Sequence, residues 1–137
     1  MKLDLPWMKD LSVNRYRFGR PGQHHQWHQA RRPHVQAWHD AVVMLIRNAR
    51  QRQYAARTGR NLGWSHLPMP KTPMRIQIWY RWPEKRRRDP GNFHKVIEDA
   101  ISEAVQVDDC HFLVTDEAVE VDSTNPGFTI RIPDVIG

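Results

Sequence analysis

The sequence predicts a single domain that combines helices with strands, and three patterns in its 137 residues lead to this prediction. Apolar side chains recur at helical spacing in two segments, near residues 34–52 and 90–106. Apolar and polar side chains alternate over residues 74–82, a period of two that is typical of a strand with one buried face. A chain of this length buries roughly two thirds of its unfolded surface, so one core is expected.

Two short strands and a loop are predicted before the first helix. Residues 3–7 and 11–18 have the composition of short strands, and Pro6 and the glycines after residue 18 bound them. Both segments suit the edge of a sheet. Residues 20–33 are polar and have the composition of a loop.

The first helix is predicted from about His34 to about Arg52. Its apolar residues fall on one face, which leaves Arg47 and Arg50 on the opposite face. These apolar residues are Trp38, Ala41, Val42, Leu45, Ile46 and Ala49. Glycine, proline and basic residues then dominate, so a surface insertion is predicted near residues 51–73.

The second half of the chain is predicted to contain a strand, a helix and three further strands. The strand 74–82 leads into a basic run, and a second helix begins at Asp89–Pro90 and ends near Gln106. Its apolar face consists of Phe93, Ile97, Ala100, Ile101 and Ala104. Three strand candidates follow, at 112–115, 118–122 and 127–132.

The net charge of +6 conceals a sharp division between the two parts of the chain. Residues 1–88 contain 19 Lys or Arg against four Asp or Glu, a balance of +15, whereas residues 89–137 contain two against 11, a balance of −9. A basic excess of this size is typical of a protein that binds a polyanion, and nucleic acid is the leading candidate. A solvated basic surface is the alternative.

Composition also indicates where the protein works. No apolar run approaches the roughly 20 residues of a membrane span, and the N-terminus lacks the layout of a secretory signal. The single cysteine, Cys110, cannot form an internal disulfide, which agrees with a reducing compartment. We therefore expect a cytoplasmic protein with no membrane partner.

The most informative motif spans residues 86–109. Three arginines precede Asp89, Lys95 and Asp99 follow on the second helix, and the pair Asp108–Asp109 ends it. Each acid has a structural alternative: Asp89 suits a helix N-cap, Lys95 and Asp99 suit an ion pair, and Asp108–Asp109 suits a turn. If the next strand pairs beside strand 74–82, the acidic pair can return to Asp89.

These residue types match the needs of phosphodiester cleavage. Carboxylates hold Mg²⁺, which neutralises charge on the phosphoryl oxygens and acidifies a bound water. Lys95 would then orient the attacking water or stabilise the charge of the transition state, and cationic side chains would clamp the phosphates. The candidates for contacts to nucleic acid are Arg15, Lys85, Arg86, Arg87, Arg88, Asn92 and Lys95. Arg15 has a packed loop position as its alternative.

The chain resembles the RusA-type Holliday junction resolvases, small phage and prophage endonucleases. The resemblance rests on Leu5-Pro6-Trp7, on Ser12 to Tyr16, on the helix 38–49 and on the segment Arg-Arg-Asp-x-x-Asn-x-x-Lys with Asp108–Asp109. It extends to the strand 128–132 and leaves out the 51–73 insertion and the loop over residues 20–33, which contains His24, His25 and His28.

This resemblance implies an α+β fold, with a small mixed β-sheet packed against two main helices in one RusA-like domain over residues 1–137. It implies a homodimer that binds branched DNA and nicks a four-way junction with Mg²⁺, for which Mn²⁺ can substitute. Asp89, Asp108 and Asp109 correspond to the metal carboxylates, and Asp89, Lys95 and Asp109 to the catalytic residues. It also implies a phage or prophage protein in a bacterial host.

One departure from the family pattern opens an alternative. Gly91 stands where the prototype of the family has a second aspartate. The chain is therefore expected to be a Mg²⁺-dependent junction endonuclease, in which Asn92 or Asp99 completes the metal shell, or else a non-catalytic or weakly active protein that binds branched DNA.

Overall fold

The computed structural model of the protein describes residues 1–12, 17–21 and 27–135. Its centre is a four-stranded sheet with the strand order β1–β6–β4–β5. β1 (Lys2–Pro6) pairs antiparallel with β6 (Gly127–Arg131), and β6 pairs antiparallel with β4 (Met74–Trp82). β4 pairs in parallel with β5 (Phe112–Val121), so the sheet is mixed.

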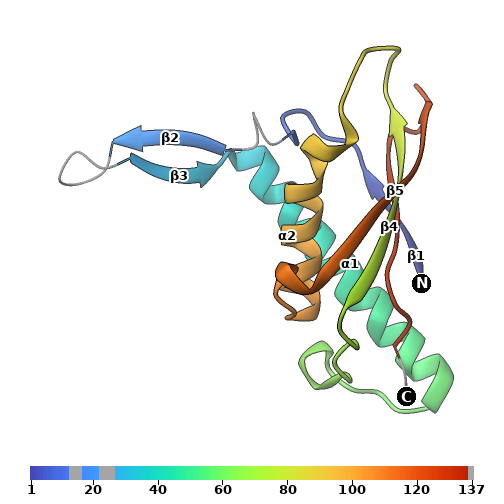
Figure 1. Ribbon diagram of the computed structural model, residues 1–137. Coiled ribbons are helices and arrows are strands. Elements are labelled where there is room, and N and C mark those ends of the chain that lie inside the picture. Colours follow the sequence, from blue (N-terminus) through green and yellow to red (C-terminus); the bar gives the residue numbers. More distant parts are fainter. Residues whose placement is uncertain (13–16, 22–26, 136–137) are drawn as a thin grey trace.

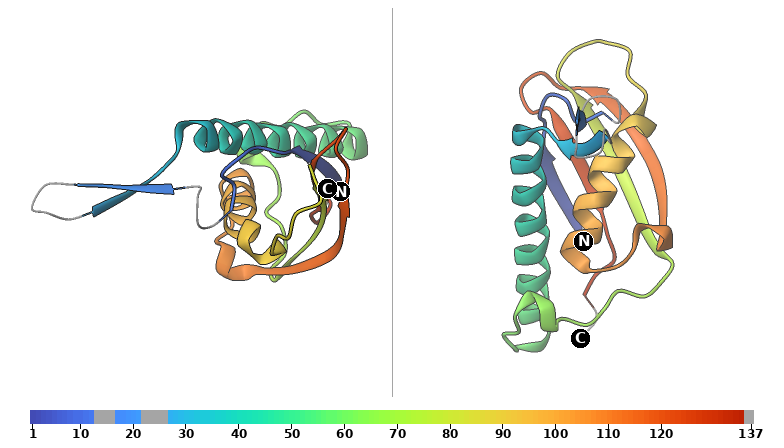
Figure 2. Two further views of the ribbon diagram at one scale, coloured as in Figure 1. Left: turned by 90° about the horizontal axis from the view of Figure 1, so that it is seen from above. Right: turned by 90° about the vertical axis from the view of Figure 1, so that its left-hand side faces the viewer.

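Two main helices, α1 (Pro33–Thr58) and α2 (His94–Val105), cover the same face of this sheet (Figures 1 and 2). α2 is the crossover that a parallel pair of strands requires, because it connects the end of β4 to the start of β5. The mixed sheet and the two helices confirm the predicted α+β class. The edge position of β1 is confirmed as well.

β4 forms the middle of the core, as its alternation predicts. Ile76, Ile78 and Tyr80 are at most 1% exposed and face the helices, whereas Arg75, just before them, is exposed. The parallel pairing of β4 with β5 meets the condition under which the acids after α2 can return toward Asp89.

α1 is longer than the sequence pattern predicts. It begins at Pro33, a favoured first position, and continues to Thr58, where Gly59 ends it in the left-handed conformation with φ of 70°. The last turns stay helical because Tyr54 packs against Leu67 and Val135 in a small second core. The predicted end near Arg52 is therefore wrong, and residues 51–58, predicted at the start of the insertion, are helical.

The buried face of α1 also differs from the prediction. Ala41 is exposed, while Val35 and Val43 are buried, because the helix packs against both the sheet and α2. Arg50, predicted on the outer face, is 5% exposed and donates a hydrogen bond to the Pro68 carbonyl at 3.1 Å. It therefore fixes the following segment, which contains the short 3-10 helix η2 (Trp64–His66).

A separate two-stranded sheet extends away from the body (Figure 1). It pairs β2 (Arg17–Pro21) with β3 (Trp27–Arg31) in antiparallel register. The predicted loop over 20–33 is therefore wrong at both strands. Backbone hydrogen bonds pair the two strands of this hairpin. Its sequence does not alternate between apolar and polar residues, so the pattern used for β4 could not predict it.

The remaining strands agree with the predicted strands, except that two of the candidates form one strand. The two candidates at 112–115 and 118–122 form the single strand β5, with a register shift in the middle. None of the helices in the described part of the chain has the length and apolar character of a membrane span.

Candidate active site

Asp89 lies at the end of the loop after β4, where it caps the 3-10 helix η3 (Pro90–Phe93). Its Oδ1 accepts a hydrogen bond from the Gly91 amide at 3.0 Å, which confirms the predicted cap. Phe93 anchors this turn, because its ring centroid lies 5.2 Å from that of Trp82 and 5.6 Å from that of Trp7. Aromatic packing therefore fixes the position of Asp89 relative to the sheet.

Lys95 joins the first turn of α2 to the connection that follows the helix. Its Nζ lies 2.9 Å from Asp99 Oδ1 and 3.5 Å from Asp109 Oδ2. The hydrogen bond to Asp99 is the largest cause of a raised pKa of Lys95, and the Asp109 charge adds to the effect. The predicted pair Lys95–Asp99 is therefore present, and Asp109 has returned alongside the helix.

Asp108 and Asp109 occupy different positions in the turn after α2. Asp108 caps the 3-10 helix η4 (Asp109–His111), and its Oδ1 accepts a hydrogen bond from the Cys110 amide at 3.0 Å. This bond lowers the pKa of Asp108. Asp109 faces Lys95, so the two neighbours have separate partners.

A further carboxylate comes from the middle of β5. Asp116 Oδ1 lies 2.8 Å from His94 Nε2 and accepts a hydrogen bond from the Tyr80 hydroxyl. The same hydroxyl lies 3.4 Å from the carbonyl oxygen of Pro90, the residue after Asp89. Asp116 is therefore connected through Tyr80 to the turn that positions Asp89.

The groups around the Tyr80 hydroxyl raise the pKa of Tyr80. Burial is the largest cause of the raised pKa of Tyr80, followed by Asp116 and then by the charges of Glu98 and Asp89. Burial also raises the pKa of Glu98, and the charge of Asp109 acts in the same direction. Five acids thus share one region, which we call the acidic cluster: Asp89, Glu98, Asp99, Asp109 and Asp116.

A groove of about 450 Å³ lies beside Asp89. Its lining includes Trp7, Lys9, Arg86, Arg87 and Asn92. The side chains of Arg86 and Arg87 are exposed, so they add positive charge to a groove that adjoins the acidic cluster. Cleavage of a phosphodiester uses cations that bind its oxygens and carboxylates that hold a metal ion, and this region contains both kinds of group.

Arg88 also lines the groove, but other groups hold its guanidinium. It lies 5.2 Å from the Trp7 ring centroid and 5.6 Å from that of Trp82, and it forms an ion pair with Glu84. Such cation–π contacts stabilise the loop. Lys85 is exposed beside it.

A comparison with protein families identifies the family of the chain. A family model described as Endodeoxyribonuclease RusA matches residues 11–133 of the chain. The chain belongs to the RusA family. This confirms the resemblance found in the sequence, and the match spans the acidic cluster and the groove-forming loop. A search of curated proteins found no match.

The structure places the RusA-like motif residues in three settings. Lys95 contacts both Asp99 and Asp109, whereas Asp89 is one of the charges around Tyr80. Asn92 lines the groove. Arg15 lies outside the described residues.

Sequence reasoning missed Asp116, Tyr80, His94 and Glu98 as neighbours of the site. A signal for Asp116 was present, because Phe112, Val114 and Asp116 occupy alternate positions of β5. An acid therefore stands where the strand pattern calls for an apolar side chain. The pairing of His94 with Asp116 depends on the crossover and had no sequence signal.

The donor chemistry of the acidic cluster fits the hard cation that the RusA resemblance implies. Carboxylate oxygens are the ligands that Mg²⁺ and Mn²⁺ prefer. The carboxylates of Asp89, Asp108 and Asp109, the predicted ligands, do not form a tight group in the described structure, because each of them has a local partner.

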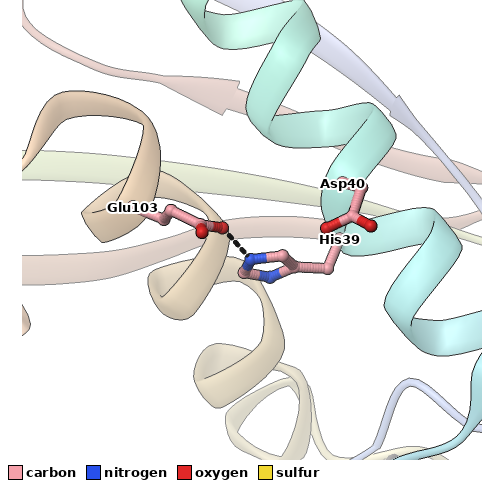
Figure 3. Close-up of side chains that lie close together, drawn as sticks. All are labelled: His39, Asp40 and Glu103. Atoms are coloured by element: carbon pink, nitrogen blue, oxygen red, sulfur yellow. Dashed lines mark hydrogen bonds and ion pairs between the residues drawn. The ribbon is translucent and has the colours of Figure 1, made fainter.

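A second group of potential ligands lies between the two helices (Figure 3). The ligand atoms of His39, Asp40 and Glu103 lie within 4.8 Å of one another. His39 is 2% exposed and its Nε2 contacts Glu103, while Asp40 Oδ1 accepts a hydrogen bond from Gln36 at 2.8 Å. The contact between His39 and Glu103 ties α1 to α2, whereas Gln36 and Asp40 both belong to α1.

Proposed function

We propose that the protein is a Mg²⁺-dependent endonuclease that resolves four-way DNA junctions by paired nicks. The observation that supports this most is the acidic cluster beside an arginine-lined groove, in a chain of the RusA endodeoxyribonuclease family. Neither feature alone would suffice, because acidic groups and basic surfaces are both common.

In this proposal, Asp89 and Asp109 hold the metal ion, with Asp108 beside them. A bound Mg²⁺, or Mn²⁺ in its place, supplies Lewis-acid stabilisation of the phosphoryl oxygens and a more acidic water. Asp89 is exposed and uses only Oδ1 for its cap, so rotation of its side chain can bring the carboxylate toward an ion.

Lys95 has the clearest role among the cationic residues. Asp99 and Asp109 hold its ammonium group, and these contacts, the hydrogen bond to Asp99 above all, favour the charged form and raise the pKa of Lys95. A fixed positive charge next to a metal carboxylate stabilises the negative charge that develops on the phosphorane. Lys95 can also orient the attacking water.

The basic loop binds the DNA backbone in this proposal. Arg86 and Arg87 are exposed at the groove and Lys85 precedes them, so they contact phosphates on either side of the scissile bond. Asn92 offers a neutral amide donor in the same groove. Arg88 supports the loop through Trp7 and Trp82 and reaches a phosphate only by leaving Glu84.

Two further features complete the proposal. A four-way junction is resolved by nicks on two opposed strands, and a symmetric homodimer supplies two such sites. The substrate is intracellular DNA, so we place the protein in the cytoplasm of a bacterial host, as a phage or prophage product.

A gel assay tests the proposal. Labelled four-way junction, splayed-arm and linear duplex DNA are incubated with the protein, with and without Mg²⁺. We expect paired nicks in the junction that require Mg²⁺, and loss of nicking with retained binding in Asp89→Asn and Asp109→Asn. Protein that binds the junction but never nicks it would contradict the proposal and support the binding-only alternative that Gly91 raises.

A further inference from the structure

The β2–β3 hairpin projects beyond the two helices and the main sheet, as the views in Figures 1 and 2 agree in showing. Its two strands pair with each other and form a sheet of their own. A two-stranded hairpin by itself is only marginally stable in water. The arrangement therefore favours a partner that contacts the hairpin in the working complex.

The two strands of the hairpin carry positive charge and no acid. β2 reads RFGRP and β3 reads WHQAR, so neither strand contains aspartate or glutamate. In the antiparallel register Arg17 lies opposite Arg31, and Arg20 lies opposite His28. Like charges directly opposite each other destabilise a sheet, and a bound anion offsets this repulsion. The register therefore indicates an anionic partner.

The base of the hairpin is tied to the helix that carries Lys95. Arg31, the last residue of β3, has its Nη2 3.6 Å from Asp99 Oδ2, and its Nη1 donates a hydrogen bond to Gln36 Oε1 at 3.0 Å. The other oxygen of Asp99 lies 2.9 Å from Lys95 Nζ. The hairpin therefore starts close to the lysine of the proposed active site and extends away from it.

The length of the strands sets how far the hairpin reaches. Each strand has five residues, which at about 3.4 Å per residue span about 17 Å. One strand of a DNA duplex advances about 3.4 Å per nucleotide, so this length matches about five base pairs. The major groove of B-DNA is wide enough for a two-stranded β-ribbon. The hairpin thus has a shape and a charge that suit duplex DNA.

We propose that the β2–β3 hairpin is a DNA-binding arm that lies along the duplex next to the nicked position, where Arg17 and Arg20 bind phosphates. This inference rests on the proposed function and deepens it, because it adds a contact surface apart from the groove of Arg86 and Arg87. A second copy of the chain has the same net charge of +6 and is the poorer partner for a basic arm.

Fluorescence anisotropy with a labelled four-way junction in EDTA tests the inference without cleavage. Arg17→Ala/Arg20→Ala should weaken binding about tenfold near physiological salt and lower the slope of log K against log salt by about two, because two phosphate contacts are lost. Lys71→Ala/Arg75→Ala is the matched control, since both residues are exposed and lie just before β4 or in its first turn of pairing, far along the strand from Asp89. The control should bind within twofold of the unmodified protein.

Hydroxyl-radical footprinting locates the contact on the DNA. We expect the unmodified protein and the control to protect about five base pairs of flanking duplex that Arg17→Ala/Arg20→Ala leaves open. Footprints of equal length in all three proteins would overturn the inference. An unchanged footprint together with altered sedimentation of the DNA-free double variant would also overturn it, because the hairpin would then contact a second copy of the chain.

A milder variant keeps the test valid if the double variant unfolds, which thermal unfolding detects. Arg20→Gln retains a long polar side chain and removes one charge, so the salt slope should fall by about one. An unchanged slope in a folded Arg20→Gln protein would contradict the role of the hairpin.

The outcomes separate this inference from the proposed function, because binding is measured without a metal ion. A protein whose hairpin protects the duplex but which never nicks the junction with Mg²⁺ would end the proposed function and leave the arm standing. Mg²⁺-dependent nicking with footprints of equal length would end the arm alone. A protein that binds no branched DNA would end both proposals.

Discussion

Two histidine–carboxylate pairs involve opposite ends of α2, and they differ in what surrounds them. Near the end of the helix, Glu103 contacts His39 of α1, which is 2% exposed. At its beginning, His94 contacts Asp116 of β5, and its side chain is 28% exposed. The first pair joins two helices, whereas the second adjoins four other acids and a basic groove.

The proposed function assigns the reactive site to the region whose ligand atoms are less closely spaced. His39, Asp40 and Glu103 have the tighter geometry, yet the nearby guanidinium of Arg47 stacks 3.4 Å from the Trp64 ring centroid and donates to the Glu103 carbonyl. The acidic cluster is looser, but the exposed arginines beside it can bind a phosphate. Function depends on the surroundings that a substrate meets.

The largest expected effect separates the two regions by activity. Asp109→Asn should lower the single-turnover rate of junction nicking on the order of 10³-fold, because it removes a metal carboxylate and a partner of Lys95. Glu103→Gln, the control from the other pair, should change the rate less than twofold. Equal loss in both variants would contradict the distinction between them.

The next effect separates them by stability. His39→Ala should lower the free energy of unfolding by about 2–4 kcal/mol, because it opens a cavity between the helices and leaves Glu103 without its partner. His94→Ala should cost less, since its ring is partly exposed. Urea denaturation measures both. A larger loss for His94→Ala would show that its contact with Asp116 is chiefly structural.

A smaller effect concerns the basic groove. The double variant Arg86→Ala/Arg87→Ala should weaken junction binding about tenfold near physiological salt and reduce the slope of log K against log salt by about two. Arg57→Ala is the control, because Arg57 lies in the last turn of α1 and pairs with Asp134. An unchanged salt slope in the double variant would place the DNA elsewhere.

The smallest effect concerns an acid outside both regions. Asp122 accepts hydrogen bonds from Thr124 and Asn125, and these bonds lower the pKa of Asp122. Its stabilisation is therefore complete above the ordinary aspartate pKa and disappears as the pH falls through the lowered value. Asp122→Asn should lower Tm slightly at pH 7, and the difference should shrink as the pH falls through the lowered pKa of Asp122. A constant difference across this range would argue against the charge as the cause.

Much of the fold was predictable from periodicity. The alternation of β4 and the helical spacing of α2 follow from which side chains are buried. β4 has the predicted bounds, whereas the predicted start of the second helix is the 3-10 helix η3 and α2 itself begins at His94. The end of α1 was not predictable, because Tyr54 stays helical through contacts with Leu67 and Val135, which are distant in sequence. The β2–β3 hairpin likewise depends on backbone pairing and not on an apolar pattern.

The site was predictable only in part for a related reason. Asp89, Lys95, Asp99 and Asp109 fall in one short segment, so motif spacing brings them to notice. Asp116 and Tyr80 come from two strands that become neighbours only when α2 crosses over in parallel. The register shift after Ile78 sets the position of Asp116, and a register is a property of the folded sheet.

Anomalous diffraction from crystals soaked in Mn²⁺ compares the two regions most directly. We expect one strong anomalous peak at Asp89 and Asp109, and none beside His39 and Glu103. A peak at His39, Asp40 and Glu103 with an empty acidic cluster would contradict the account, because the metal chemistry would then belong to the contact between the helices.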